Sequence, residues 1–355
     1  MLRGGSNLGI KIAIAFGSVL ACQSVLSAQG AGPELRVYGA PSFSADGRYL
    51  AVIVERLRPT VDWRIRILDS LSWNEINLTP RAIPNNRDCT EFAWSPAGQE
   101  FTYALHNEEV QSLQRRIGSL SPIAVKVIPQ ETSSIFDPVA KWSRNGRFLA
   151  FGDGSTNQMY RYGLAGDEMR SVTPERPFRV YAFDWADDGE SVWIAAGDAD
   201  FGTELKNDGI IRIYFEGRKA ITLCNLPRIT RIKASPDRKW LACELAQEVM
   251  HAGIRCSLAL VEVSSGKIRE IGLVDSDTEP VWRSDSKYLA YSDGPEIRLF
   301  DPVQGSTYAS HWIGSSRSQP FWNPADNSLW VNPYKGSEIR KWTGKEWALV
   351  YVVRP

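Results

Sequence analysis

The chain has 355 residues, of which 43% are hydrophobic, and its 41 Lys and Arg residues are matched by 41 Asp and Glu residues. This hydrophobic content is enough for a large core and excludes a chain that is disordered throughout. The balanced charge excludes the basic footprint that nucleic-acid binding requires. The aromatic residues are more informative, because the 13 Trp recur at regular intervals along the chain.

Residues 1–28 predict an export signal. Two positive residues, Arg3 and Lys11, precede an apolar run over 12–21, which is shorter than the roughly 20 apolar residues of a membrane-spanning helix. Two processing points fit this segment: ordinary signal cleavage after Ala28, or a bacterial lipobox that ends before Cys22 and leaves this cysteine lipidated. The sequence therefore predicts a periplasmic or secreted protein, with or without a lipid anchor, and no membrane span after cleavage.

One motif recurs seven times after the signal. Each copy starts with an aromatic residue or Ala, continues with Ser, Asp, Asn and Gly turn residues, and ends in a strand that usually contains Leu-Ala. The first positions are Phe43, Trp94, Trp142, Trp185, Ala234, Trp282 and Trp322. Their spacings of 40–51 residues match the length of a four-stranded propeller blade. We therefore predict an all-β fold with a single domain over residues 33–355: a seven-bladed β-propeller of four-stranded antiparallel blades. A ring of six or eight blades stays open.

The expected elements follow the same order in every repeat. The first strand ends at the motif aromatic, which we expect to pack between neighbouring blades, and the turn after it uses Asp or Asn side chains and a Gly with φ > 0. The later strands include 48–54, 63–68, 124–128, 147–151, 210–215, 219–223, 258–263 and 296–300 in chain order. Residues 345–353 are the expected outer strand of the last blade; alternatively, residues 35–38 cross over to seal the ring.

The motif resembles the repeat of TolB-like (WD40-like, PD40-type) propellers, whose signature is Trp-Ser-Pro-Asp-Gly followed by a strand ending in Ile or Leu and Ala. The resemblance covers about residues 33–355 and implies the fold, since the repeat residues build blades and not sites. Two features differ from that family. Arg238, Ser286 and Asp326 replace the Gly in the last three repeats. No room remains for the separate N-terminal domain of TolB, so a direct role in that envelope system is not expected.

Polar residues three or five positions before a motif aromatic are expected near the mouth of the central channel, on the face with the longer loops. These candidates are Glu91, Asp137, Arg231, Asp277, Glu279, Arg317 and Gln319. Their mixed charges leave two interpretations open: a binding site, or ion pairs between blades.

The chain lacks the usual signs of an enzyme. It has three His in different repeats, whereas a metal site needs ligands that converge on one ion, and it has no Gly-x-Ser-x-Gly elbow. Some relatives of the TolB repeat are pectin-fragment lyases that bind metal through several His, which this chain does not match. We expect no cofactor and no metal.

The sequence therefore favours a non-catalytic scaffold, monomeric and exported, that recognises an envelope protein or a glycan. Exposed Trp63 and Trp312 would suit stacking on sugars. The alternative is a polysaccharide lyase or hydrolase at the channel mouth that uses carboxylates such as Glu91, Asp137 or Glu279.

Cys243 and Cys256 lie on two consecutive predicted strands. A hairpin centred between residues 249 and 250 would place them opposite each other and permit a cross-strand disulfide. Two buried free thiols are the other interpretation.

Overall fold

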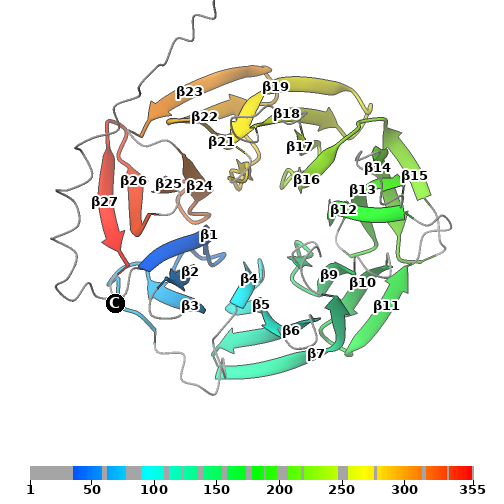
Figure 1. Ribbon diagram of the computed structural model, residues 1–355, viewed down its shortest axis with the longest axis horizontal. Coiled ribbons are helices and arrows are strands. Elements are labelled where there is room, and N and C mark those ends of the chain that lie inside the picture. The colour runs from blue at the N-terminus through cyan, green and yellow to red at the C-terminus, as the bar shows by residue number, and fades with distance from the viewer. Residues whose placement is uncertain are drawn as a thin grey trace, which may run out of the picture.

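The computed structural model describes residues 35–57, 62–76, 89–107, 112–121, 123–133, 140–153, 158–172, 178–187, 189–198, 207–216, 220–246, 255–275, 278–313, 317–333 and 336–353. These residues form seven antiparallel sheets arranged around a central axis (Figure 1). The predicted seven-bladed β-propeller is therefore confirmed. The export signal, with Cys22, and the candidates Asp137 and Asp277 lie outside the described residues.

The blades follow one another in chain order. Blade 1 contains β1 (Leu35–Phe43), β2 (Tyr49–Arg56) and β3 (Asp62–Asp69); blade 2 contains β4 (Cys89–Trp94), β5 (Glu100–Asn107), β6 (Ser112–Leu120) and β7 (Ile123–Ser133). Blade 3 contains β8 (Lys141–Trp142), β9 (Phe148–Asp153), β10 (Gln158–Gly163) and β11 (Glu168–Val172); blade 4 contains β12 (Phe178–Trp185), β13 (Ser191–Asp198), β14 (Asn207–Tyr214) and β15 (Ala220–Cys224).

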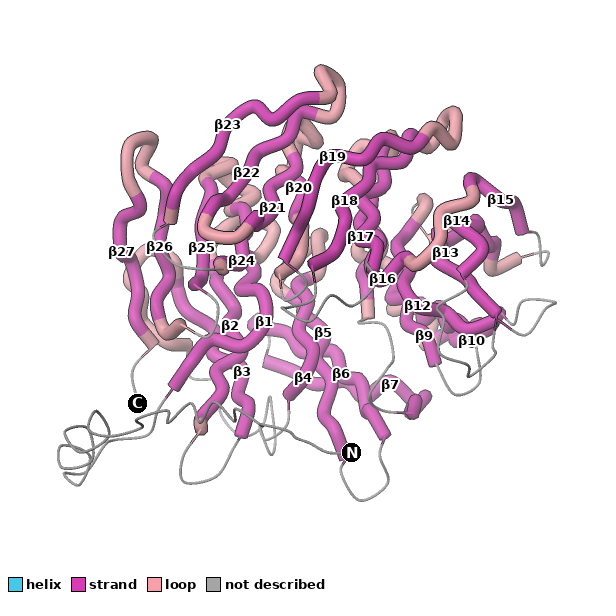
Figure 2. Tube along the Cα trace, turned by 45° about the horizontal axis from the view of Figure 1, so that its top comes forward, coloured by secondary structure: helices cyan, strands magenta, loops and turns pink. Residues whose placement is uncertain are grey.

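The remaining three blades have the same plan. Blade 5 contains β16 (Ile229–Ala234), β17 (Trp240–Ala246), β18 (Arg255–Glu262) and β19 (Ile268–Asp275); blade 6 contains β20 (Val281–Trp282), β21 (Leu289–Asp293), β22 (Glu296–Asp301) and β23 (Ser306–Trp312). Blade 7 contains β24 (Ser318–Trp322), β25 (Leu329–Pro333), β26 (Glu338–Trp342) and β27 (Trp347–Val352). In Figure 2 the described residues form only strands and loops. Among them no helix has the length and apolar character needed to cross a bilayer.

Six blades have the predicted four strands, each paired with its neighbours in sequence. Blade 1 has three strands among the described residues, and an isolated bridge between Leu68 and Glu75 follows β3. In the part of the chain that the structure describes, the ring closes without a shared strand, because β1 pairs with β2 and all four strands of blade 7 come from residues 318–352. The predicted outer strand over 345–353 is thus confirmed as β27, and the crossover of residues 35–38 is not formed.

Side chains and main chain together hold the seam between blades 1 and 7. The main-chain N–H of Val37 donates to the carbonyl of Gly336 at 2.9 Å. The ring of Phe43 lies 5.9 Å from Phe321 and 5.4 Å from Trp330, centroid to centroid. These rings belong to one buried cluster, so the first motif aromatic seals the ring by packing.

The motif tryptophans form a ladder between blades. In five blades the indole Nε1–H donates to a main-chain oxygen of the preceding blade, and that oxygen always belongs to the residue just before the preceding motif position. The pairs are Trp94 to Ser42 (2.9 Å), Trp142 to Ala93 (3.1 Å), Trp185 to Lys141 (2.8 Å), Trp282 to Lys233 (3.0 Å) and Trp322 to Val281 (3.2 Å). Blade 5 has Ala234 at this position, and its main-chain N–H donates instead to Asp184 Oδ2 of blade 4 at 2.8 Å. The expected packing of the motif aromatics between blades is confirmed.

The backbone conformation of the motif turns explains why Gly occupies the fifth motif position and which residues replace it. Gly47 has φ +69°, and a Cβ there would lie 2.4 Å from Asn323 Oδ1 of blade 7. Arg238 and Ser286 adopt the same left-handed region at φ 63°. In blade 7 the sequence placed this position at Asp326, but the left-handed residue is Asn327. The turn there is one residue longer, since the N–H of Asn327 bonds to the carbonyl of Asn323, four residues back.

The proposed Cys243–Cys256 disulfide is not formed, and both thiols are free. In the hairpin of β17 and β18, Cys243 lies opposite Ala259 and Cys256 lies opposite Ala246. This register differs from the predicted one by three residues, and an odd shift turns the two side chains to opposite faces of the sheet. Cys243 packs in a core that includes Ile229, whereas Cys256 packs in a different cluster on the other face. The alternative of two buried free thiols is confirmed.

Candidate functional site

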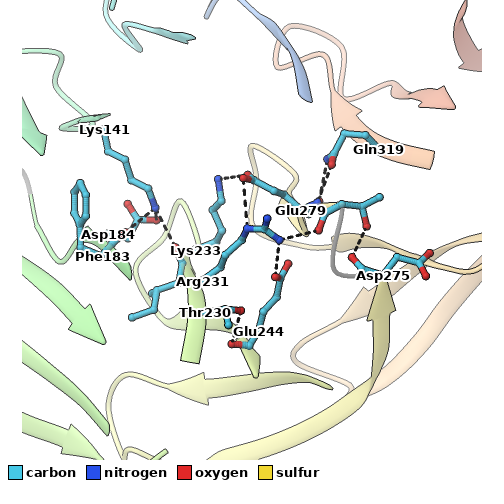
Figure 3. A network of polar contacts seen from close by, with 12 residues as sticks. Lys141, Phe183, Asp184, Thr230, Arg231, Lys233, Glu244, Asp275, Glu279 and Gln319 are labelled. Carbon is cyan, nitrogen blue, oxygen red and sulfur yellow. Dashed lines mark hydrogen bonds and ion pairs between the residues drawn. The ribbon is translucent and has the colours of Figure 1, made fainter. Parts of the chain in front are cut away.

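The inner strands of blades 3–7 carry a network of polar side chains around the central axis (Figure 3). Strand β16 shows how the strand pattern builds it. Successive side chains of a strand point to opposite faces, so Ile232 is buried in the core while Arg231 and Lys233 share the other side and face the network. Glu279 lies just before β20, and Gln319 lies in β24.

Lys233, Arg231 and Glu279 join blades 5 and 6. Lys233 Nζ lies 2.7 Å from Glu279 Oε2, and Arg231 Nε lies 3.7 Å from the other carboxylate oxygen. The side chains of Lys233 and Glu279 are 31% and 33% exposed, so both retain some contact with solvent. The ammonium group of Lys233 and the guanidinium of Arg231 lower the pKa of Glu279 to about 2 despite its burial. Glu279 is therefore an ionised, doubly paired carboxylate at neutral pH.

Glu244 lies deeper, at the end of β17. Its side chain is 1% exposed, and Arg231 Nη1 donates to its Oε2 at 2.7 Å. The Oε1 atom is buried without a hydrogen-bond partner. Burial raises the pKa of Glu244 to about 7, and the nearby Arg231 only partly offsets this rise. Glu244 can therefore take up a proton near neutral pH.

Gln319 links blade 7 to blade 6 through main-chain atoms. Its Oε1 accepts from the N–H of Glu279 at 2.7 Å, and its Nε2 donates to the carbonyl of the same residue at 3.0 Å. Next to this clamp, Asp275 accepts hydrogen bonds from the hydroxyl of Ser292 at 3.1 Å and the N–H of Gly294 at 3.0 Å. Arg317, just before β24, has its Nε 3.8 Å from Asp275 at the end of β19, which adds an ion pair between the start of blade 7 and blade 5.

Lys141 joins three blades with one ammonium group. Its Nζ donates to the carbonyl of Phe183 in blade 4 at 2.7 Å and to the carbonyl of Ile232 in blade 5 at 3.0 Å. Asp184 Oδ2 lies 3.4 Å from the same nitrogen. Burial lowers the pKa of Lys141 to about 8, while Asp184 acts in the opposite direction. A cation in this position compensates main-chain dipoles from two neighbouring blades.

The structure brings together some of the predicted residues and separates others. Arg231, Glu279 and Gln319 meet in the network, and Arg317 lies at its edge. Glu91 is elsewhere: it is buried, pairs with Arg115 at 3.1 Å and accepts from the N–H of Ala140 in blade 3 at 3.3 Å. The binding role of these residues stays a prediction.

The sequence rule missed three members of the network. Lys141, Asp184 and Lys233 each lie one position before a motif residue, whereas the candidates were taken three and five positions before it. All three offsets fall on the same side of a strand, because its side chains alternate. Extending the rule to this third offset would have found them. Nothing in the motif pattern marks Glu244 or Asp275, which lie at the ends of other strands.

The histidine and tryptophan side chains that the sequence singled out differ in their surroundings. Of the three His, only His311 has a described side chain, and it stacks on Trp342 with centroids 4.2 Å apart. Trp312 is 66% exposed, as expected, but Trp63 packs partly against the core between blades 1 and 2. Among the residues that the structure describes, no three His, Cys, Asp or Glu side chains gather in a way that could hold a metal ion.

No protein-family model matches the chain, and no curated protein matches it in sequence. Solved structures do match. The β-propeller domain of the Trilobed protease from Pyrococcus furiosus, described as having an open velcro topology, aligns with a TM-score of 0.60 at 14% identity, over 90% of this chain and 100% of that chain.

Two further propellers are similar. The Cps50 (Swd1) β-propeller domain of Myceliophteria thermophila aligns with a TM-score of 0.56 at 12% identity, covering 84% of this chain and 95% of that one. KlAtg21, in a complex with the coiled coil of AgAtg16, aligns with a TM-score of 0.55 at 13% identity, covering 89% and 98%. At these identities the likeness shows the fold alone, and the chain is a seven-bladed β-propeller similar in architecture to these domains.

Proposed function

We propose that this chain is an exported, non-catalytic interaction scaffold that recognises an envelope protein or a glycan. One observation carries the proposal: polar contacts run without interruption from blade 3 to blade 7. Lys141 connects blades 3, 4 and 5, the Lys233–Glu279 pair connects blades 5 and 6, and Gln319 connects blades 6 and 7. A ring held in this way presents its loops on a rigid platform, which lowers the entropy lost on binding.

The ionisation of Glu279 also indicates that the network has a structural role. Both oxygens of Glu279 face cations, and its pKa near 2 keeps it ionised. A general acid needs a pKa close to the working pH, which Glu279 does not have. The proposal further agrees with the complex of the propeller KlAtg21 with the coiled coil of AgAtg16, in which a protein of this fold has a protein partner.

The test begins with export. Mass spectrometry of the mature N-terminus distinguishes cleavage after Ala28 from lipidation at Cys22, and cell fractionation locates the product. The mature protein then serves as bait for quantitative capture from envelope extracts. We expect specific capture that a denatured bait does not reproduce. An uncleaved protein in the cytoplasm contradicts export, and turnover of any substrate contradicts the non-catalytic role.

The alternative, a polysaccharide lyase or hydrolase at the channel mouth, has its own supporting observation. Burial brings the pKa of Lys141 to about 8 and that of Glu244 to about 7, which is the range of general bases and acids near neutral pH. A panel of polysaccharides is incubated with the native protein and with the Lys141→Met, Glu244→Gln and Glu279→Ala variants. Product that disappears in these variants but persists in Trp312→Ala would favour the enzyme.

A further inference from the structure

A second site lies outside the channel network. Blades 6 and 7 line an open surface cleft of about 690 Å³, formed by the motif turn of blade 6, strands β22 and β23, the motif turn of blade 7, and β26. Its volume falls within the range of about 300–1,000 Å³ that is typical of small-molecule sites. None of its lining residues belongs to the network of polar side chains around the central axis that includes Lys141, Arg231 and Glu279.

A pair of tyrosines forms one wall of the cleft. The rings of Tyr288 and Tyr308 stack with centroids 4.8 Å apart. Tyr308 occupies a bulge in β23, because Thr307 pairs with Phe300 and Ala309 pairs with Leu299. A bulge redirects the side chain of the extra residue. Although it stacks on Tyr288, Tyr308 remains 65% exposed, so much of its ring is available to a ligand.

A second aromatic pair crosses the blade boundary. His311 of β23 lies against Trp342 of β26, with centroids 4.2 Å apart. Burial lowers the pKa of His311, so its imidazole is neutral at pH 7 and can both donate and accept a hydrogen bond. The cleft therefore has aromatic surfaces from both blades.

The polar groups of the cleft favour a negative ligand. Arg283 lies 4.5 Å from the centroid of the Tyr288 ring and is held by two hydrogen bonds to Asp285, at 2.8 and 2.6 Å. Lys287 is exposed at the same turn. Asn327 and Ser328 of blade 7 add hydrogen-bonding groups. Among the described residues that line the cleft there are two cations and no carboxylate.

We propose that this cleft binds a saccharide that carries an acidic group. A pyranose ring has an apolar C–H face that packs on aromatic rings such as Tyr308 and Trp342, and a polar edge that suits Asn327 and Ser328. Its acidic group would lie near Lys287. A quaternary ammonium ligand would be repelled by Lys287, and a wholly apolar ligand would desolvate that ammonium without compensation, whereas Arg283 is already paired with Asp285. This inference rests on the proposed binding role and gives it a ligand class and a place.

The test uses a matched pair of probes, cellobiouronic acid and cellobiose, which differ in one carboxylate, with binding measured by calorimetry and NMR. We expect the native protein to bind the acid about tenfold more tightly, a difference of about 1.4 kcal/mol. Lys287→Gln should remove that preference, and Tyr308→Ala should weaken the binding of both sugars. Trp312→Ala is the matched control, since Trp312 is an equally exposed aromatic of β23 that does not line the cleft.

Three results would overturn the inference: no binding of either sugar at millimolar concentration, equal affinity for the two sugars, or an equal loss in Tyr308→Ala and Trp312→Ala. Preferential binding of adenosine monophosphate would assign the cleft to nucleotides instead. Thermal melts of each variant separate loss of binding from loss of folding. Because partner capture is measured independently, a cleft that binds no sugar leaves the scaffold proposal intact, and an empty capture experiment does not alter the sugar result.

Discussion

Lys141 in blade 3 donates a hydrogen bond to the main-chain oxygen of Ile232 in blade 5, across the inner edge of blade 4. The same ammonium bonds to blade 4 through the carbonyl of Phe183. Most contacts in a propeller join adjacent blades, so a single side chain that reaches the second neighbour fixes the relative positions of three sheets. Lys141 is therefore the residue whose loss we expect to loosen this part of the ring most.

Replacing Lys141 with Met tests this role. The variant keeps a similar apolar stem and loses the ammonium, which leaves two carbonyls without their donor, so we expect a loss of about 1–3 kcal/mol in the free energy of unfolding at pH 7. The lowered pKa of Lys141, about 8 against the ordinary 10.5, adds a pH dependence. Between these pH values the unfolded chain binds a proton that the folded chain does not. The unfolding free energy of the native protein should therefore increase, relative to that of the variant, as the pH rises from 8 to 10.5. Urea unfolding at pH 7 and pH 10 measures both effects, and a pH-independent difference would contradict the assignment.

The ion pair of Glu279 predicts acid sensitivity. Because its pKa is lowered to about 2 from the ordinary 4.5, its stabilisation is complete above pH 4.5 and is lost as the pH falls towards 2. The difference in unfolding free energy between native protein and Glu279→Gln should therefore shrink over this window. Glu168→Gln is the control, since the side chain of Glu168 is 53% exposed and pairs with Arg170 on the surface, where a salt bridge contributes little. A constant difference for Glu279→Gln would show that the pair is not formed.

The tryptophan ladder predicts a large cost for one indole and a small cost for another. Trp142 is 9% exposed and bonds to Ala93, whereas Trp312 is 66% exposed. Trp142→Ala should lower the unfolding free energy by about 3–5 kcal/mol through lost burial and the cavity left behind. Trp312→Ala should change it by less than about 0.5 kcal/mol. Equal losses in chemical denaturation would refute the inter-blade position of Trp142.

Gly47 and Gly98 occupy the same motif position in blades 1 and 2 and should respond differently to Ala. Gly47 has φ +69°, and an added Cβ would meet Asn323 and Ala325 across the seam. We expect a loss of at least about 1 kcal/mol from the left-handed backbone alone, increased by the clash. A Cβ at Gly98 would meet nothing within 4 Å, so Gly98→Ala should be nearly neutral. Thermal unfolding of the two variants measures the difference.

The different burial of the cysteine thiols predicts the order in which a reagent labels them. Cys243 is fully buried and Cys256 is 3% exposed, while Cys224 is half-buried. Burial raises the pKa of the Cys243 thiol well above its ordinary value, which disfavours the reactive thiolate. Among these three cysteines, iodoacetamide should modify Cys224 first under native conditions, and Cys243 and Cys256 only after unfolding. A mass loss of two hydrogens that reduction restores at Cys243 and Cys256 would mean that the disulfide forms after all.

The sequence was sufficient for the blade count and for the role of the motif aromatics, because both follow from a repeat whose spacing and turn chemistry are local. It was also sufficient to place Arg231, Glu279 and Gln319 in or just before the inner strands, since strand alternation determines which side chains share a face. The same rule applied at one more offset would have included Lys141 and Lys233.

Other features depend on contacts between segments that are distant in sequence. The register of β17 and β18 is fixed by packing of both faces against neighbouring blades, so counting from the middle of the loop misplaced Cys256 relative to Cys243. The cleft between blades 6 and 7 arises from a bulge at Tyr308 and from Trp342 of the next blade. Neither position carries a motif that reveals the other.

The seam between blades 1 and 7 has a consequence for how the chain can be rearranged. Because the described strands of each blade follow one another in sequence, and none of them lies in a blade at the far end of the chain, these sheets would survive a cut in any connection between blades. Joining the existing ends and opening the polypeptide elsewhere, a circular permutation, would therefore move the seam without breaking a β-ladder. The contacts of Phe43 and Val37 across the present seam would then lie between covalently linked blades, while another pair of neighbouring blades would have to be held by non-covalent contacts alone.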